Sequence, residues 1–121
     1  MPASPKAFEL HHQDDVAVVR VNEAKMAYAT LEDLQRELAL AIEVGCVRKM
    51  VVNLAPVAFL DSFGIGVIVV TARKMSQAGG QLKLCGVGER VRMSLTITRL
   101  DRTLDIVADE AEAVRSLGAQ A

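Results

Sequence analysis

The sequence predicts an α/β domain: a mixed β-sheet of four to five strands with about four helices packed mainly on one face. Three observations predict this class. Valine-rich runs alternate with amphipathic runs along most of the chain. Two opening runs are close enough for a hairpin, whereas the later ones are separated by helix-length segments, which favours parallel pairing. Hydrophobic residues make up 51% of the 121 residues, enough for one core.

Strands are predicted where a short apolar run is bounded by turn residues or by charges. The expected strands are Phe8 to Gln13, Val16 to Val21, Met50 to Leu54, Gln81 to Val87 and Thr103 to Val107. Asp14 and Asp15 separate the first two strands and are typical of a turn, so this pair forms an antiparallel hairpin. We expect residues 1–7 to be a flexible N-terminal tail and residues 8–118 to form the single domain.

Helices are predicted where apolar residues recur every three or four positions behind a capping residue. The expected helices are Thr30 to about Gly45, Ser62 to Gln77, Glu89 to Leu95, and a last one opening at Asp109. The first has Thr30 as its cap, Gly45 as its C-terminal cap, and an inner face of Leu31, Leu34, Leu38 and Ile42. In the last, Glu112 stands at the capping-box position, and Ala113, Val114 and Leu117 face inward.

The segment from Phe59 to Val70 is the most informative of the chain. It places an acid, Asp61, a hydroxyl, Ser62, and the glycines Gly64 and Gly66 at the front of an almost wholly apolar helix. A serine at a helix N-terminus faces unpaired backbone N–H groups and the positive end of the helix dipole, which can hold a phosphate. The spacing therefore suits a serine that accepts a phosphate without unfolding the domain.

A helical wheel assigns two sides to the helix from Ser62 to Gln77. The predicted core side holds Ile65, Ile68, Ala72 and Met75, and the solvent side holds Arg73, Lys74 and Gln77. On or beside the solvent side fall Ser62, Phe63, Gly66 and Val70. Apolar groups exposed beside a hydroxyl favour a docking surface. The alternative is that a neighbouring loop covers Phe63 and Val70.

Composition argues against several classes of function. The formal net charge of −1 and an aromatic content of 3% give neither the field nor the stacking platforms of a nucleic-acid binder. The longest apolar run, Ile65 to Val70, is too short to span a bilayer, and no apolar signal core follows Met1, so a soluble cytoplasmic protein is expected. Cys46 and Cys85 are best explained as small buried residues, although a disulfide stays possible.

Enzymatic and cofactor-binding alternatives find little support. Ser62 could be a nucleophile, but its surroundings are not Gly-x-Ser-x-Gly, and His11 and His12, the two histidines, lie on one strand and point to opposite faces. The pair Gly64 and Gly66 lacks the third glycine of a dinucleotide fingerprint, and no Walker lysine is present. The cysteines and histidines show no metal-ligand spacing. We expect no catalytic residue, no cofactor and no metal.

The order strand, Asp-Ser-x-Gly, apolar helix, Gly-Gly, strand resembles the STAS domain of bacterial anti-sigma factor antagonists. The matching segments are Val51 to Leu54, Phe59 to Val67, Gly79-Gly80, Leu82 to Cys85, and Thr98 to Ile106. The resemblance covers roughly residues 8 to 118. It implies a single STAS-type domain that is not an enzyme.

The resemblance also implies a mechanism of partner switching. In that family the serine after the aspartate, here Ser62, is phosphorylated by an anti-sigma factor that is also a serine kinase. The unphosphorylated antagonist binds this kinase and releases the sigma factor, and a PP2C-type phosphatase reverses the modification. We predict that the partner surface comprises Asp61, Ser62, Phe63, Gly64, Gly66 and Val70. A monomer or weak dimer is expected.

Two departures from the family pattern are visible. Phe63 stands where the family usually carries a second hydroxyl residue, and the loop from Val21 to Met26 lacks a Gly-x-x-Asp turn. An alternative function therefore stays open, in which the domain is a scaffold or an accessory subunit of a signalling or transport assembly without this phosphorylation switch.

Overall fold

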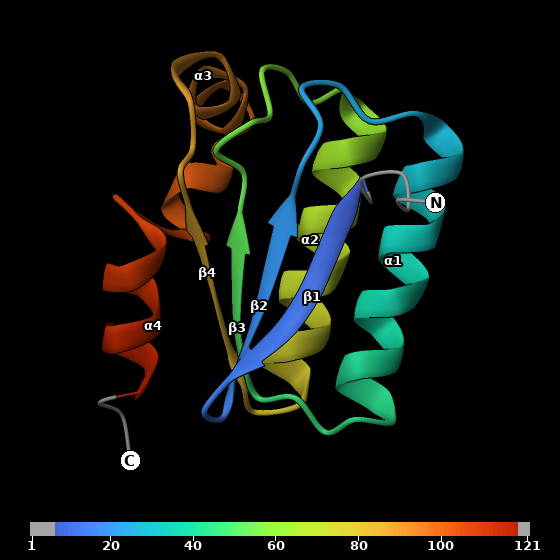
Figure 1. Ribbon diagram of the computed structural model, residues 1–121. Helices are drawn as coiled ribbons and strands as arrows, with labels where there is room; N and C mark the ends of the chain where they lie inside the picture. The colour runs from blue at the N-terminus through green and yellow to red at the C-terminus, as the bar shows by residue number, and fades with distance from the viewer. Residues whose placement is uncertain (1–6, 119–121) are drawn as a thin grey trace, which may run out of the picture.

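The computed structural model describes residues 7–118, and its strands form one five-stranded sheet in the order β1-β2-β3-β4-β5 (Figure 1). These strands are β1 (Phe8–Gln13), β2 (Val16–Val21), β3 (Lys49–Asn53), β4 (Gln81–Cys85) and β5 (Asp105–Val107). The hairpin β1–β2 is antiparallel, and the pairs β2–β3, β3–β4 and β4–β5 are parallel. The predicted mixed sheet is confirmed. Most of the predicted tail lies outside the described residues.

Four α-helices and one 3-10 helix complete the fold of the described residues. They are α1 (Tyr28–Glu43), α2 (Ser62–Gln77), α3 (Glu89–Ile97), the 3-10 helix η1 (Leu100–Arg102) and α4 (Glu110–Gly118). Helices α1 and α2 cover one face of the sheet, and α4 lies on the opposite face (Figure 1). The α/β fold class is confirmed.

The core has a large layer and a small one. The large layer lies between the sheet and α1 and α2, and α3 adds the buried Val91 and Leu95 to it. The small layer packs α4 on the other face through Val16, Val18, Val51, Cys85, Ala113 and Leu117. Because side chains alternate along β2, Val18 faces α4 while Val19 faces the large layer. Central strands buried on both faces explain the nearly unbroken apolar runs of the sequence.

Both ends of α1 differ from the prediction. The helix begins at Tyr28 rather than at Thr30, and its N-cap, Ala27, makes no side-chain capping bond. Packing of its buried apolar face therefore decides where it starts. At the other end Cys46, rather than Gly45, takes the left-handed conformation (φ 57°). A Cβ on Gly45 would lie 2.8 Å from the Ala41 carbonyl oxygen, so close approach explains that glycine.

The two cysteines have different surroundings. Both are free thiols; Cys85 is buried, as expected, but Cys46 is exposed, which corrects the prediction for that residue. Its exposure follows from its place in the turn after α1. Burial raises the pKa of the Cys85 thiol to about 11, with the charges of Glu110 and Asp109 adding to the effect. Cys85 therefore stays a protonated core residue at neutral pH.

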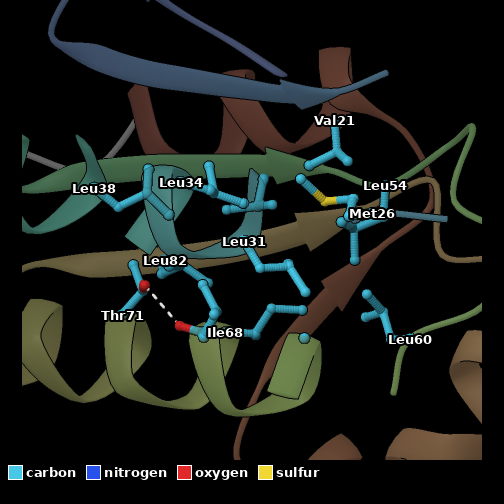
Figure 2. Close-up of a pocket in the computed structure, with 13 residues that line it drawn as sticks. Val21, Met26, Leu31, Leu34, Leu38, Leu54, Leu60, Ile68, Thr71 and Leu82 are labelled. Atoms are coloured by element: carbon cyan, nitrogen blue, oxygen red, sulfur yellow. Dashed lines mark hydrogen bonds between the residues drawn. The ribbon is translucent and has the colours of Figure 1, made fainter. Parts of the chain in front are cut away.

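A cavity of about 20 Å³ lies in the large layer, between the sheet and helices α1 and α2 (Figure 2). Its walls are apolar apart from the Thr71 hydroxyl, which donates to the Val67 carbonyl at 2.7 Å. A buried water needs two or more polar partners, so this space suits none, and it is far too small for a nucleotide. It marks slight underpacking beneath the start of α2.

Candidate functional site

Helix α2 begins at Ser62, as the sequence predicts, and Asp61 is its N-cap. The Asp61 carboxylate accepts a hydrogen bond from the backbone N–H of Gly64 at 2.9 Å. The backbone carbonyl of Asp61 accepts the first hydrogen bond of the helix, from the Ile65 N–H, at 3.0 Å. Asp61 therefore shapes the entry to the helix as its N-cap.

Ser62 is exposed at the first position of α2. Its hydroxyl has no hydrogen-bond partner among residues 7–118. The loop that precedes it follows the carboxyl end of β3, the edge of a parallel sheet where α/β proteins commonly place their binding groups. The hydroxyl is therefore accessible to another protein.

An aromatic pair lies beside Ser62. The Phe63 ring is half-buried, and its centroid lies 4.5 Å from that of Tyr28, with a 38° angle between the planes. Tyr28 is 62% exposed at the start of α1. Phe63 is thus partly covered by a side chain of α1 and also packs against the large core layer. Val70 is half-buried on the same helix.

A second exposed aromatic side chain stands on the loop before α2. Phe59 is 41% exposed, and the Arg90 guanidinium carbon of α3 lies 5.7 Å from the centre of its ring, within cation–π range. The chain has three phenylalanines, one tyrosine and no tryptophan. All but Phe8 therefore lie near Ser62 in sequence or in contact with Phe63. Such concentration of scarce aromatic side chains is typical of a binding surface.

The loop that carries Phe59 is held in place by buried side chains and by a backbone hydrogen bond to a neighbouring loop. Leu54, Val57 and Leu60 are buried and anchor the segment between β3 and α2. The Ala58 N–H donates to the Ala24 carbonyl at 3.0 Å and links this segment to the loop before α1. Residues 22–27 and 54–61 thus form one continuous surface around the start of α2.

The two glycines of the motif have different roles. Gly64 is buried, and a Cβ there would lie 2.9 Å from Leu60 Cδ2. Its expected place in the partner surface is not supported, because it has no exposed group to present. Gly66 is half-buried, and a Cβ there would meet nothing within 4 Å. It leaves open space one turn after Ser62.

The orientation of α2 agrees with the wheel in part. Its buried residues are Gly64, Val67, Ile68, Thr71 and Met75. Ile68 and Met75 are buried as the wheel predicts, and Ile65 and Ala72 are half-buried but pack against the large layer. Arg73 and Gln77 are exposed as expected. Lys74 is half-buried and forms an ion pair with Glu43 of α1 at 2.7 Å. The helix is therefore turned so that the flank carrying Phe63 and Lys74 faces α1.

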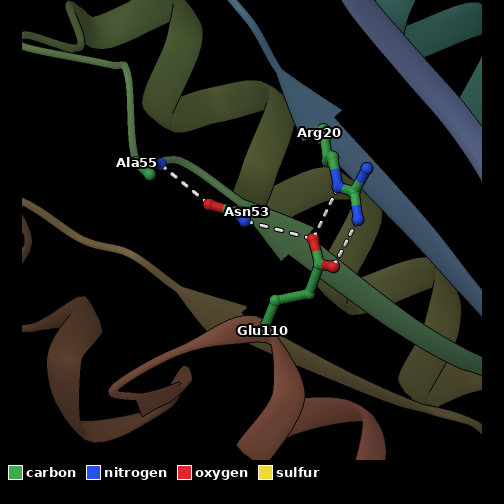
Figure 3. A network of polar contacts seen from close by, with 4 residues as sticks. All are labelled: Arg20, Asn53, Ala55 and Glu110. Atoms are coloured by element: carbon green, nitrogen blue, oxygen red, sulfur yellow. Dashed lines mark hydrogen bonds and ion pairs between the residues drawn. The ribbon is translucent and has the colours of Figure 1, made fainter.

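A polar network that no pattern in the sequence predicted connects α4 to the ends of β2 and β3 (Figure 3). Arg20 of β2 donates to both carboxylate oxygens of Glu110, at 2.8 and 2.6 Å. The Asn53 amide donates to Glu110 at 3.1 Å and accepts from the Ala55 N–H at 2.9 Å. Asn53 thereby fixes the start of the loop that leads to Ser62. The sequence feature that could have indicated this network is Asn53, a polar residue at the end of the apolar strand β3.

The network has a clear electrostatic signature. The bonds from Arg20 lower the pKa of Glu110 from its usual 4.5 to about 2, against burial, which raises it; the Asn53 bond adds to the lowering. The same ion pair raises the pKa of Arg20. Glu110 is therefore ionised throughout the physiological range.

The other candidate residues do not gather into a site. His11 is half-buried and His12 exposed, in line with the expectation of one partly buried and one exposed histidine. No cluster of three or more metal-ligating side chains occurs within residues 7–118. Across that same part of the chain, each helix is too short or too polar to cross a bilayer.

Comparison with known proteins assigns the family. The family model described as the STAS domain matches residues 7–113. The chain belongs to the STAS domain family. The anti-sigma F factor antagonist of Paenibacillus polymyxa is 27% identical over 109 residues, which span 90% of this chain and 92% of that protein.

Solved STAS structures share the fold. An anti-sigma-factor antagonist domain protein from Planctomyces limnophilus superposes with a TM-score of 0.83 at 19% identity, over 93% of this chain and 98% of that one. Bacillus SpoIIAA in its phosphorylated form gives a TM-score of 0.76 at 22% identity, over 91% and 98%. The mixed five-stranded sheet with its four helices is thus the STAS fold.

Proposed function

We propose that this STAS domain is an anti-sigma factor antagonist and that Ser62 is its phosphorylation site. The observation that carries the proposal is the exposure of Ser62 at the start of α2, on a helix capped by Asp61 and flanked by exposed aromatic side chains. The similarity to an anti-sigma F factor antagonist over nine-tenths of the chain supports the same role. The domain is a binding module and a kinase substrate rather than an enzyme.

In the proposed cycle the unphosphorylated protein binds an anti-sigma factor with serine kinase activity, and the sigma factor is released. The contact surface is Asp61, Ser62, Phe63, Gly66 and Val70. Phosphorylation adds about −1.5 to −2 charges at neutral pH, in the middle of an apolar contact. A loss of about 3 kcal/mol is more than a hundredfold in affinity, so no large rearrangement is needed.

The fold tolerates this modification for a physical reason. The phosphate would lie at the N-terminus of α2, where free backbone amides and the helix dipole offset its charge. The Asp61 carboxylate, held by the Gly64 amide, would repel the phosphate and is not a ligand for it. A PP2C-type phosphatase would remove the phosphate and restore binding.

The test compares the wild type, Ser62→Ala and Ser62→Asp in pull-downs from the native host, read by mass spectrometry. We expect the wild type and Ser62→Ala to retain an anti-sigma factor with a kinase domain and Ser62→Asp to lose it. The captured kinase, given ATP, should place phosphate on Ser62 of the wild type. Equal capture by all three proteins, or phosphate on another residue, would overturn the proposal.

A further inference from the structure

Strand β1 stands at the edge of the sheet, paired to β2 on one side only. The backbone groups on its outer side have no strand partner within residues 7–118. Exposed edges of this kind invite pairing with another strand, and proteins either blunt them or use them. The side chains along β1 decide between these two outcomes.

The hydrogen-bond alternation of the hairpin shows which residues of β1 face outward. The register pairs Phe8 with Val21, and the Asn22 N–H donates to the Ala7 carbonyl at 2.7 Å. Since antiparallel ladders alternate between bonded and non-bonded pairs, Glu9 and His11 direct their backbone groups toward β2. Phe8, Leu10 and His12 therefore direct their N–H and C=O groups toward the open edge.

We propose that two copies of this chain pair through their β1 edges, antiparallel, with a two-fold axis at Leu10. Leu10 then lies opposite Leu10 of the second copy, and Phe8 lies opposite His12. These are the outward-facing residues, so each pair can exchange both backbone bonds. The result is one continuous sheet through both copies, built from an isologous interface.

Side-chain pairing favours this register. With the axis at Leu10, Glu9 lies opposite His11 of the second copy, and His11 lies opposite Glu9, on the face of the sheet that carries α4. An axis at Glu9 would place two carboxylates together, and an axis at His11 would place two imidazoles together. An imidazole N–H can donate a hydrogen bond to a carboxylate that lies opposite it, whereas two carboxylates placed opposite each other repel. A two-fold axis at Leu10 therefore satisfies both the backbone hydrogen bonds and the side-chain pairs across the two strands.

The space beside β1 admits a second strand. A hollow of about 880 Å³ lies between β1 and α1, bordered by Phe8, Leu10, Thr30, Asp33, Arg36 and Leu40. Leu40 is 50% exposed there, and Phe8 and Leu10 are only half-buried. Helix α1 therefore does not close the edge. Pairing would cover these apolar groups, which gives the dimer a hydrophobic contribution besides the backbone bonds.

The test is analytical ultracentrifugation of the full chain over a wide range of concentrations, with circular dichroism to verify folding. We expect the wild type to dimerise with a dissociation constant on the order of tens of micromolar, the weak end of specific association. His12→Pro deletes one outward N–H and leaves the β1–β2 bonds intact. It should weaken the dimer at least tenfold, whereas the matched control His12→Ala should not.

Exchanging the side chains at positions 9 and 11 provides a second, independent test of the dimer. Glu9→Lys and His11→Glu should each weaken self-association. An equimolar mixture of the two variants should associate again, because the lysine introduced in one copy would face the carboxylate introduced in the other. A wild type that stays monomeric at millimolar concentration would overturn the proposal. So would a dimer insensitive to both His12→Pro and the charge variants, which would place the interface elsewhere. Neither outcome bears on Ser62.

Discussion

The Tyr28 and Phe63 rings form a tilted pair with their centroids 4.5 Å apart, and this contact joins the first residue of α1 to the second residue of α2. The N-termini of α1 and α2 are therefore in contact one residue away from the exposed Ser62. Because Tyr28 stays 62% exposed, its ring is available to the partner proposed to contact Ser62. The surface around Ser62 therefore combines aromatic side chains with the open space at Gly66.

Replacing Tyr28 should separate binding from stability. Tyr28→Ala is expected to lower the affinity for the anti-sigma partner at least tenfold, because large aromatic side chains near the centre of an interface carry much of its energy. It should change the free energy of unfolding by less than about 1 kcal/mol, since the side chain is exposed. Isothermal titration and urea denaturation measure the two effects. Val44→Ala, at the 74% exposed C-cap of α1, is the matched control.

Removing the cap of α2 should cost stability. Asp61→Ala deletes the acceptor of the Gly64 N–H and is expected to lower the free energy of unfolding by about 1 kcal/mol. Asp61→Asn keeps an acceptor and should lose much less. Chemical denaturation compares the three proteins. Equal loss in both variants would show that the carboxylate charge, rather than the hydrogen bond, stabilises the helix.

A negative charge at Ser62 should leave the fold intact. Ser62→Asp places a carboxylate at the first turn of α2, where the helix dipole favours it by a few tenths of a kcal/mol. Its melting temperature should match the wild type within about 2 °C. A large drop in melting temperature would mean that lost binding reports unfolding rather than charge. Ser62→Ala is the control for loss of the hydroxyl.

Gly66 provides a test in which stability and binding move in opposite directions. A Cβ there meets nothing within 4 Å, so Gly66→Ala should stabilise α2 by about 0.5–1 kcal/mol. The added methyl group lies one turn from Ser62 and should weaken the partner contact. Ser76→Ala, exposed near the other end of α2, should leave binding unchanged. If Gly66→Ala binds as well as the wild type, Gly66 is not part of the contact.

The Arg20–Glu110 pair predicts a dependence of stability on pH. The pKa of Glu110 is lowered from 4.5 to about 2, so the unfolded chain takes up the proton first as the pH falls. The stabilisation is complete above pH 4.5 and is lost as the pH falls toward about 2. Arg20 is 44% exposed, so solvent screening limits the effect to about 1–2 kcal/mol.

The measurement is the free energy of unfolding between about pH 2 and pH 6 for the wild type and Glu110→Gln. The variant should show a shallower loss between pH 4.5 and about pH 2. Glu112→Gln, exposed on the same helix, should follow the wild type. Parallel curves for all three proteins would mean that the ion pair contributes nothing measurable.

Much of the fold could be predicted because its signals are local. The hairpin strands and the bounds of α2 agree with the prediction, since turn residues and Asp61 mark them in the sequence. The ends of β4 and β5 agree less well: β4 stops at Cys85, and β5 begins at Asp105. At those points pairing with the neighbouring strand, rather than a residue type, decides where the strand ends.

The sequence by itself determined the elements, their order and the place of Ser62 at a helix N-terminus, because capping, periodicity and turn chemistry act over a few residues. The tertiary structure decided the rotation of α2, the burial of Gly64, the Tyr28–Phe63 contact and the Arg20–Asn53–Glu110 network. An almost wholly apolar helix has no strong polar side to orient it, so the sheet and α1 set its rotation. Contacts between residues far apart in the chain depend on that packing, and no local pattern encodes them.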